Sequence, residues 1–231
     1  PYIKKYNEER ELTLMIACDV SGSQKFGSKD KLKLEAAAEL AALFAFSAIK
    51  NSDKVGLMLF SDKIELFVPP KKGKKHVLRL IRELVAFEPQ SAGTDIGLCL
   101  ETMSKVIKRQ GILILISDFL SPVSSFSKPF KLAAKKFDLI PVIVQDKLET
   151  RLPPLHACID VTDPETGQED FLCLSSGEIN DALDDYARRQ DLNLRALFNP
   201  YKIEPIRVDT ALPPADPVIA FFKARAKKIR R

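Results

Sequence analysis

Three oxygen-bearing side chains stand at alternate positions directly after a mostly apolar stretch near the start of the chain. The stretch carries no charge from Leu12 to Cys18, and Asp19, Ser21 and Ser23 follow it. Such a stretch is typical of a strand buried on both faces, and in parallel sheets ligands bind just past the carboxyl ends of the strands. One carboxylate and two hydroxyls suit a hard cation such as Mg²⁺, which prefers oxygen ligands and keeps some of its waters.

Two later loops carry further oxygen ligands. Thr94 follows a loop with a proline and a glycine, and Asp118 follows the apolar run 112–116. We expect the strands that end at Asp19 and Asp118 to be neighbours or nearly so, which would give an octahedral site with positions left for water. On the residues alone an alternative stays open, because serines after a strand are also common as helix caps and turn formers.

Apolar strand patterns alternate with helical patterns along most of the chain, which predicts an α/β fold with a mainly parallel sheet. Two short strands around Ser61–Lys63 predict a hairpin and hence one antiparallel strand. Residues 121–127 are expected to form a serine-rich loop, and short strands should flank the turn 163–167. The predicted helices are 31–49, 77–85, 96–107, 128–136 and 178–198, and the further strands are 112–116, 139–144 and 203–208.

The length fits one large domain with appendages. We expect a lead-in over 1–10, a domain over 11–210 and a basic C-terminal helix over 211–231. The net charge of +5 is partly concentrated in residues 223–231, which hold six basic residues and no acidic one. A solvated basic end and a contact with nucleic acid or an acidic partner are both compatible with that segment.

Composition indicates a folded, soluble protein, with 45% apolar and 29% charged residues. No apolar run in this sequence approaches the roughly 18 residues of a membrane span, and we expect no signal peptide. The chain begins with Pro1, so we expect sequence upstream and a cytoplasmic protein whose only membrane association would come from that upstream region. Without any CxxC pair, the four cysteines are expected to be small buried residues of a reducing compartment, not disulfides or zinc ligands.

The pattern Asp-x-Ser-x-Ser after the first strand, a distant Thr and an Asp after a later strand resembles the metal-ion-dependent adhesion site of von Willebrand factor A domains. All five positions match: Asp19, Ser21, Ser23, Thr94 and Asp118. The resemblance implies a doubly wound sheet with one antiparallel edge strand and helices on both faces. It also implies Mg²⁺ or Mn²⁺ held by the hydroxyls directly or through water, with the aspartates acting mostly through water.

The whole chain further resembles a group of bacterial von Willebrand-like proteins that are encoded beside MoxR-type AAA+ ATPases and are catalogued as a domain of unknown function. The resemblance implies a protein partner, namely the MoxR-type ATPase or its client, and a role in assembly or maturation of other proteins. One departure is Asp146-Lys147 where the group often has Asp-Pro, and we expect that pair to lie away from the metal loops. The segments that carry the resemblance are LTLMIACDVSGS, DKVGLMLFSDKIELFVPPKKGK, GTDIGLCL, ILILISDFLSP, ETRLPP, DPETG and FFKARAKK.

Parts of the sequence also resemble the sites of three rival functions. Residues 22–29 lie between a strand and a helix like a phosphate-binding loop, but the order Ser28-Lys29 does not match the Lys-Ser/Thr that such a loop needs after its second glycine. A metal-dependent phosphotransferase or phosphatase would use Asp19 as nucleophile, but Ser21 stands where a second carboxylate is usual, and no His or Lys is evident at a strand end. Nucleic-acid binding through 71–75 and the basic end lacks interleaved aromatic residues.

The sequence therefore predicts a non-catalytic, divalent-cation-dependent interaction module. A bound cation left electrophilic by weakly donating hydroxyls would take a carboxylate from a partner, which is the hard anionic oxygen that such an ion favours. Thr94 and Asp118 are expected to lie at the partner contact.

Overall fold

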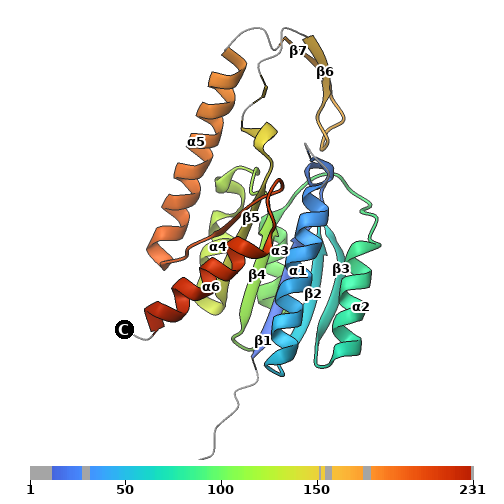
Figure 1. The fold of residues 1–231 in the computed structure, drawn as a ribbon, viewed down its shortest axis with the longest axis vertical. Coiled ribbons are helices and arrows are strands. Elements are labelled where there is room, and N and C mark those ends of the chain that lie inside the picture. Colours follow the sequence, from blue (N-terminus) through green and yellow to red (C-terminus); the bar gives the residue numbers. More distant parts are fainter. Residues whose placement is uncertain (1–11, 28–31, 151, 154–157, 174–177, 230–231) are drawn as a thin grey trace, which may run out of the picture.

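The structure is a computed structural model, and it describes residues 12–27, 32–150, 152–153, 158–173 and 178–229. Six strands form the main sheet in the order β3-β2-β1-β4-β5-β8, and β6 and β7 form a separate two-stranded hairpin. Figure 1 shows the main sheet flanked by helices, with the hairpin and one end of α5 projecting beyond the sheet. The strands are β1 (Thr13–Asp19), β2 (Lys54–Phe60), β3 (Ile64–Lys71), β4 (Ile112–Ser117), β5 (Asp138–Gln145), β6 (Cys158–Thr162), β7 (Glu169–Cys173) and β8 (Ile206–Asp209).

All neighbouring strands of the main sheet are parallel except β2 and β3, which are antiparallel. The antiparallel pair follows from the tight turn at Ser61–Lys63, because a chain that turns back so soon can only run antiparallel. The predicted fold class is confirmed: a mainly parallel, doubly wound sheet with an antiparallel edge strand. The helical segments are η1 (Gly22–Lys25), α1 (Lys33–Lys50), α2 (Lys74–Val85), α3 (Ile96–Val106), α4 (Val123–Lys136), η2 (Lys147–Glu149), α5 (Glu178–Phe198), η3 (Asn199–Tyr201) and α6 (Ala215–Ile229).

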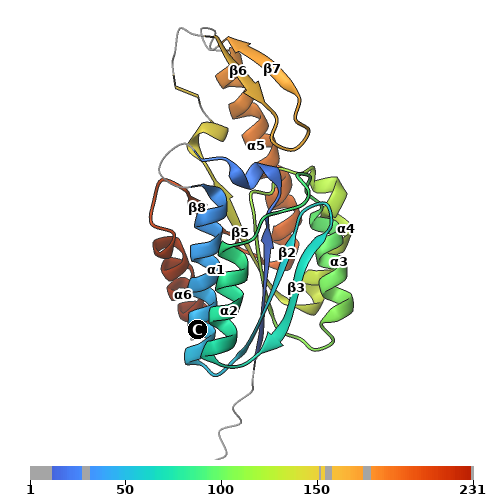
Figure 2. The same ribbon diagram turned by 90° about the vertical axis from the view of Figure 1, so that its right-hand side faces the viewer.

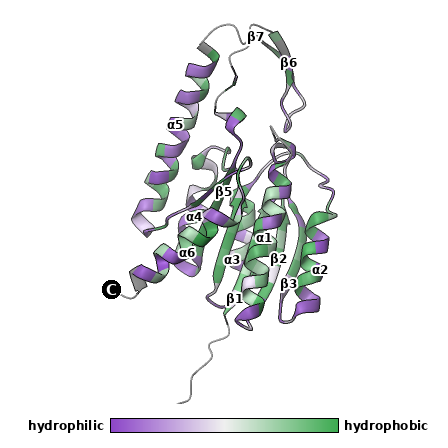
Figure 3. Ribbon diagram, in the orientation of Figure 1, coloured by the Kyte–Doolittle hydropathy of each residue, from purple (hydrophilic) through white to green (hydrophobic). Residues whose placement is uncertain are grey.

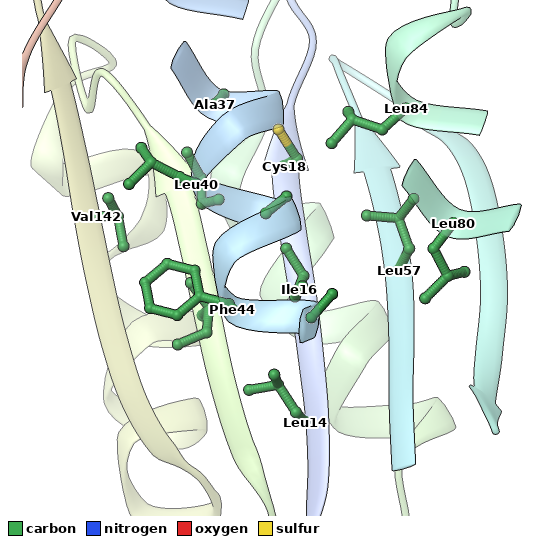
Figure 4. Packing of buried hydrophobic residues seen from close by; sticks show 14 of the residues in the cluster. Leu14, Ile16, Cys18, Ala37, Leu40, Phe44, Leu57, Leu80, Leu84 and Val142 are labelled. Carbon is green, nitrogen blue, oxygen red and sulfur yellow. The ribbon is translucent and has the colours of Figure 1, made fainter. Parts of the chain in front are cut away.

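Side chains of β1 alternate between the two faces of the sheet, so each face has its own apolar core. Leu14, Ile16 and Cys18 pack with residues of α1 and α2 on one face (Figure 4). Residues of α6 belong to the same cluster. Met15 and Ala17 pack on the other face with residues of α3, α4 and the C-terminal part of α5. Figure 2 shows these two helical layers on either side of the sheet, and Figure 3 shows that the apolar residues concentrate in its strands.

Two expectations about local structure were wrong. The serine-rich segment 121–127 is not all loop, because α4 begins at Val123, where Ser125 donates both its N–H and its hydroxyl to the Pro122 carbonyl (3.0 and 2.8 Å). The other error concerns the cysteines. Cys158 takes part in a disulfide and lies opposite Cys173 in the β6–β7 register, whereas Cys18 and Cys99 are free and buried. The cysteines therefore do not indicate a reducing compartment.

The turn predicted at 163–167 joins β6 to β7, as expected. The C-terminal helix α6 packs on the sheet through the buried Val218, and the Phe222 ring meets the Phe44 ring of α1 edge-on at 6.2 Å. Within the described ranges, no helix is long and apolar enough to cross a bilayer.

Candidate metal site at the carboxyl edge of the sheet

The site lies where β1 and β4 end side by side. Asp19 is the last residue of β1, and Asp118 directly follows β4, whose residues pair in parallel register with those of β1. Parallel neighbours end at the same edge of a sheet, so the two carboxylates come together as the sequence predicts. Both are buried, with Asp19 fully inaccessible and Asp118 3% exposed.

Asp19 is held by hydrogen bonds from both flanks. Its Oδ1 accepts the Ser21 N–H at 3.0 Å, and its Oδ2 accepts the hydroxyl of Ser117 at 2.7 Å. Burial, and then the negative charge of Asp118, raises the pKa of Asp19 to about 7, against the opposing effect of these hydrogen bonds. A carboxylate whose ionised form is disfavoured by its surroundings is typical of a functional site. A bound cation would offset both the burial and the repulsion from Asp118.

Ser21 and Ser23, the serine pair, link the β1 loop to Asp118. The Ser21 and Ser23 hydroxyl oxygens are 3.2 Å apart, and the Ser23 hydroxyl donates to Asp118 Oδ2 at 2.7 Å. Ser21 occupies the N-cap position of η1, but its side chain makes no capping hydrogen bond. Helix capping, the alternative left open by the sequence, therefore does not account for the serine pair.

Asp118 also receives two donors that the sequence did not reveal. Its Oδ2 accepts Gln24 Nε2 at 3.0 Å and the Lys33 ammonium at 2.7 Å, while its Oδ1 accepts the Leu120 N–H at 3.2 Å. This lysine comes from a helix and not from a strand end. Lys33 is the first residue of α1, and its side chain is fully buried.

The Lys33 ammonium also pairs with Glu149 of η2, whose side chain is 15% exposed. Burial lowers the pKa of Lys33, but its two carboxylate neighbours outweigh that effect and leave it raised. Burial likewise raises the pKa of Glu149, only partly offset by Lys33. Glu149 opens the ETRLPP segment, and its Oε2 accepts the Asp146 N–H at 3.0 Å. The segment around Asp146-Lys147 is therefore in contact with the site, contrary to the expectation that it lies away.

Thr94 lies in a loop that contacts the β1 loop, but its side chain is not hydrogen-bonded to the serine pair or to the two aspartates. The Ala92 carbonyl of its loop accepts the Gly22 N–H at 2.7 Å, and Asp95, not Thr94, caps α3 through the Leu98 N–H at 2.8 Å. The Thr94 hydroxyl donates to Glu165 Oε1 in the β6–β7 turn at 2.8 Å. The structure thus joins four of the five predicted residues in one hydrogen-bonded cluster and places the fifth beside it.

The residues present fit a hexacoordinate hard cation. Adjacent ligands of octahedral Mg²⁺ are about 2.9 Å apart, given metal–oxygen distances of about 2.0–2.1 Å. The Ser21 and Ser23 hydroxyl oxygens, 3.2 Å apart, are close to that spacing, and Ser23 donates to Asp118, which can reach the cation through water. Gln24 Oε1 is buried and accepts no hydrogen bond from the residues that the structure describes, so it is available to a cation-bound water. The described residues hold no cluster of three or more His, Cys, Asp or Glu side chains that could bind a metal, so a site here depends on hydroxyls.

The structure resembles solved structures of low sequence identity. BatB from Bacteroides thetaiotaomicron superposes with a TM-score of 0.55 at 16% identity, over 95% of this chain and all of that one. An aerotolerance-related membrane protein from Bacteroides fragilis gives a TM-score of 0.55 at 18% identity, over 86% and 92% of the two chains. The von Willebrand A domain of SpRpn10 gives a TM-score of 0.48 at 13% identity, over 90% and 94%.

Among curated proteins, the uncharacterized protein Rv1480 of Mycobacterium tuberculosis is 25% identical over 191 residues, which are 81% of this chain. The match spans only 58% of the length of Rv1480. A family model described as "Protein of unknown function DUF58" matches residues 1–192. The chain therefore belongs to the DUF58 family.

Proposed function

We propose that this chain is a divalent-cation-dependent protein-interaction module that works with a MoxR-type AAA+ ATPase, or with a client of that ATPase, in assembly or maturation of other proteins. The cation would be Mg²⁺ or Mn²⁺ at Asp19, Ser21, Ser23, Thr94 and Asp118. The proposal of the partner is supported by the family resemblance. The proposal of the cation is supported by the geometry of the site.

The observation that carries the proposal is the 3.2 Å spacing of the Ser21 and Ser23 hydroxyl oxygens, which suits adjacent positions around one hard cation. Both carboxylates already accept hydrogen bonds on each oxygen, so the hydroxyls are the better direct ligands and the aspartates would act through water. Charge balance also supports a dication. Asp19, Asp118 and Glu149 carry three negative charges when ionised, and Lys33 returns one, leaving two to be neutralised.

Bound Mg²⁺ would supply an electrophilic centre with room for one hard anionic oxygen. The buried cluster holds its surroundings in place, since Ser117, Gln24 and Lys33 each fix one of the two aspartates. A Glu or Asp side chain of a partner would satisfy the open position. Exclusion of water at the interface would strengthen that contact, because charges attract more strongly at lower dielectric.

Metal binding is tested by calorimetry on the purified chain. We expect wild-type protein to bind Mg²⁺ or Mn²⁺ and Ser21→Ala to lose that binding while keeping its fold. Ser124→Ala, which removes an exposed hydroxyl on α4, is the matched control and should bind as wild type does. If wild type and Ser21→Ala bound the cation with equal affinity, the assignment of the metal site to these residues would be wrong.

The partner contact is tested by measuring two affinities, one for Mg²⁺ and one for the MoxR-type ATPase, in wild type and in Thr94→Ala. We expect Thr94→Ala to weaken binding of the ATPase more than it weakens binding of Mg²⁺, because Thr94 stands at the rim of the cluster and not inside it. ATPase binding that continues undiminished in chelator would contradict a partner carboxylate on the metal.

No observation favours the enzymatic alternatives. Lys33, the one lysine that reaches the cluster among the described residues, contacts Asp118 and Glu149, whereas a phosphotransferase would need its basic group at Asp19. Ser28 and Lys29 of the phosphate-loop reading lie outside the described residues, and Gly22–Lys25 forms a short 3₁₀ turn. We expect phosphatase and nucleotide-hydrolysis assays to stay at background with Mg²⁺ present. A metal-dependent rate that Asp19→Asn abolishes would instead support the phosphotransferase.

A further inference from the structure

The turn of the β6–β7 hairpin, residues 163–167, lies over the candidate metal site. Glu165 accepts the Thr94 hydroxyl at 2.8 Å. The Pro164 carbonyl packs on Gly22, between the two serines, so closely that a Cβ built on Gly22 would be 2.1 Å from its oxygen. Figures 1 and 2 both show the hairpin extending past the sheet edge and its turn pointing back at η1.

The turn is built to present Glu165. Asp163 Oδ1 accepts the N–H groups of Glu165 and Thr166 at 2.8 and 3.3 Å, which is an Asx turn. Gly167 has φ +71°, in the left-handed region that favours glycine, and its N–H returns to the Asp163 carbonyl at 2.8 Å. These hydrogen bonds hold the backbone at the tip of the turn, and the Glu165 side chain there is held by the Thr94 hydroxyl.

The hairpin is held to the site by polar contacts and not by an apolar interface. Every residue from Thr162 to Phe171 is exposed, and the Phe171 ring remains 62% accessible. Such a contact buries little apolar surface, so its release would lose little free energy. The hairpin therefore has the properties of an element that can leave the site.

We propose that Glu165 occupies, from within the same chain, the position that a partner's carboxylate takes on the metal-loaded site. The inference rests on the proposed function and adds its regulation. With the cation bound, the Glu165 carboxylate, which lies at Thr94 beside the serine pair, supplies the hard anionic oxygen for the open position. A partner then binds by presenting its own Glu or Asp on an exposed turn and displacing the hairpin.

The probe is Mn²⁺ itself, with water-proton relaxation reporting how many waters remain on the bound ion. We expect Glu165→Gln to bind Mn²⁺ about tenfold more weakly than wild type, because removing a charged ligand lowers affinity. We also expect its bound Mn²⁺ to carry more exchangeable water. Glu169→Gln, which removes an exposed carboxylate from β7 of the same hairpin, should match wild type in both respects.

Acetate, the simplest carboxylate, tests the competition. It should displace water from Mn²⁺ at lower concentration in Glu165→Gln than in wild type, because the internal carboxylate is gone. Gly22→Ala provides a second variant with Glu165 intact, since its Cβ would clash with the Pro164 carbonyl and push the turn away. It should reproduce the water and acetate results.

The outcomes separate this inference from the function on which it rests. Suppose that Ser21→Ala loses Mn²⁺ binding, but Glu165→Gln and Gly22→Ala both match wild type in affinity, in water content and in response to acetate. That result would overturn the role of the hairpin and leave the metal site in place. Failure of wild-type protein to bind Mn²⁺ would overturn both.

Discussion

Replacing Lys33 with methionine is expected to destabilise the metal-free protein and to strengthen cation binding. The Lys33 ammonium is fully buried between Asp118 and Glu149. Removing one member of a buried ion pair leaves charge uncompensated, which lowers the free energy of unfolding by about 3–5 kcal/mol. The same change removes a positive charge next to Asp118, so Mg²⁺ affinity should rise by about tenfold or more.

Urea unfolding without metal and Mg²⁺ titration give the two readouts for Lys33→Met. Lys25→Met removes an exposed positive charge from η1, which precedes α1 in the chain, and should change either quantity little. Adding Glu149→Gln to Lys33→Met should recover part of the lost stability, because one of the two unpaired carboxylates is then neutral. If Lys33→Met matched Lys25→Met in stability and in affinity, the buried ion triad would not exist in solution.

Cation affinity is expected to fall steeply below neutral pH. Burial, and then the charge of Asp118, raises the pKa of Asp19 to about 7 from its ordinary value of 3.8. The cation needs the ionised carboxylate, so protons compete with it below pH 7. The apparent affinity for Mg²⁺ should then drop about 50-fold between pH 7 and pH 5, with a slope that approaches about tenfold per pH unit at the acid end.

The stability of the metal-free protein should change in the opposite direction. The folded state binds a proton at Asp19 more tightly than the unfolded state does, so protonation stabilises the fold. The free energy of unfolding should therefore rise as the pH falls from 8 through 7. The loss of Mg²⁺ affinity at low pH is tested by Mg²⁺ titrations at several pH values. Asp19→Asn should bind Mg²⁺ weakly, and its affinity should not depend on pH in this way. If the Mg²⁺ affinity of the wild type did not change between pH 8 and pH 5, the predicted competition by protons would be contradicted.

Much of the fold follows from local pattern. The buried strands are apolar on both faces, and the tight turn after Phe60 leaves no alternative to an antiparallel partner. The placement of Asp19 and Asp118 is predictable for the same reason, because residues after adjacent parallel strands share one edge.

The rest of the site depends on contacts between distant segments. Lys33 stands at the start of a helix, and its spacing gives no sign that its ammonium turns inward to Glu149, 116 residues away. The Glu165 contact likewise requires the hairpin to fold back over the β1 loop, which no local pattern specifies. The DPETG turn was visible as a turn, and ETRLPP as a segment of the resemblance, but neither could be assigned to the site.

The most direct test of the account is a crystal of the full chain soaked in Mn²⁺ and measured for anomalous scattering. The account predicts a single strong peak within about 2.0–2.3 Å of the Ser21 and Ser23 hydroxyl oxygens, with Asp19 and Asp118 linked to it through water. The peak should be absent from Ser21→Ala crystals grown and soaked in the same way. No peak at the serine pair in saturating Mn²⁺, with Lys33 still bound to Asp118 and Glu149, would contradict a cation-dependent function for this site.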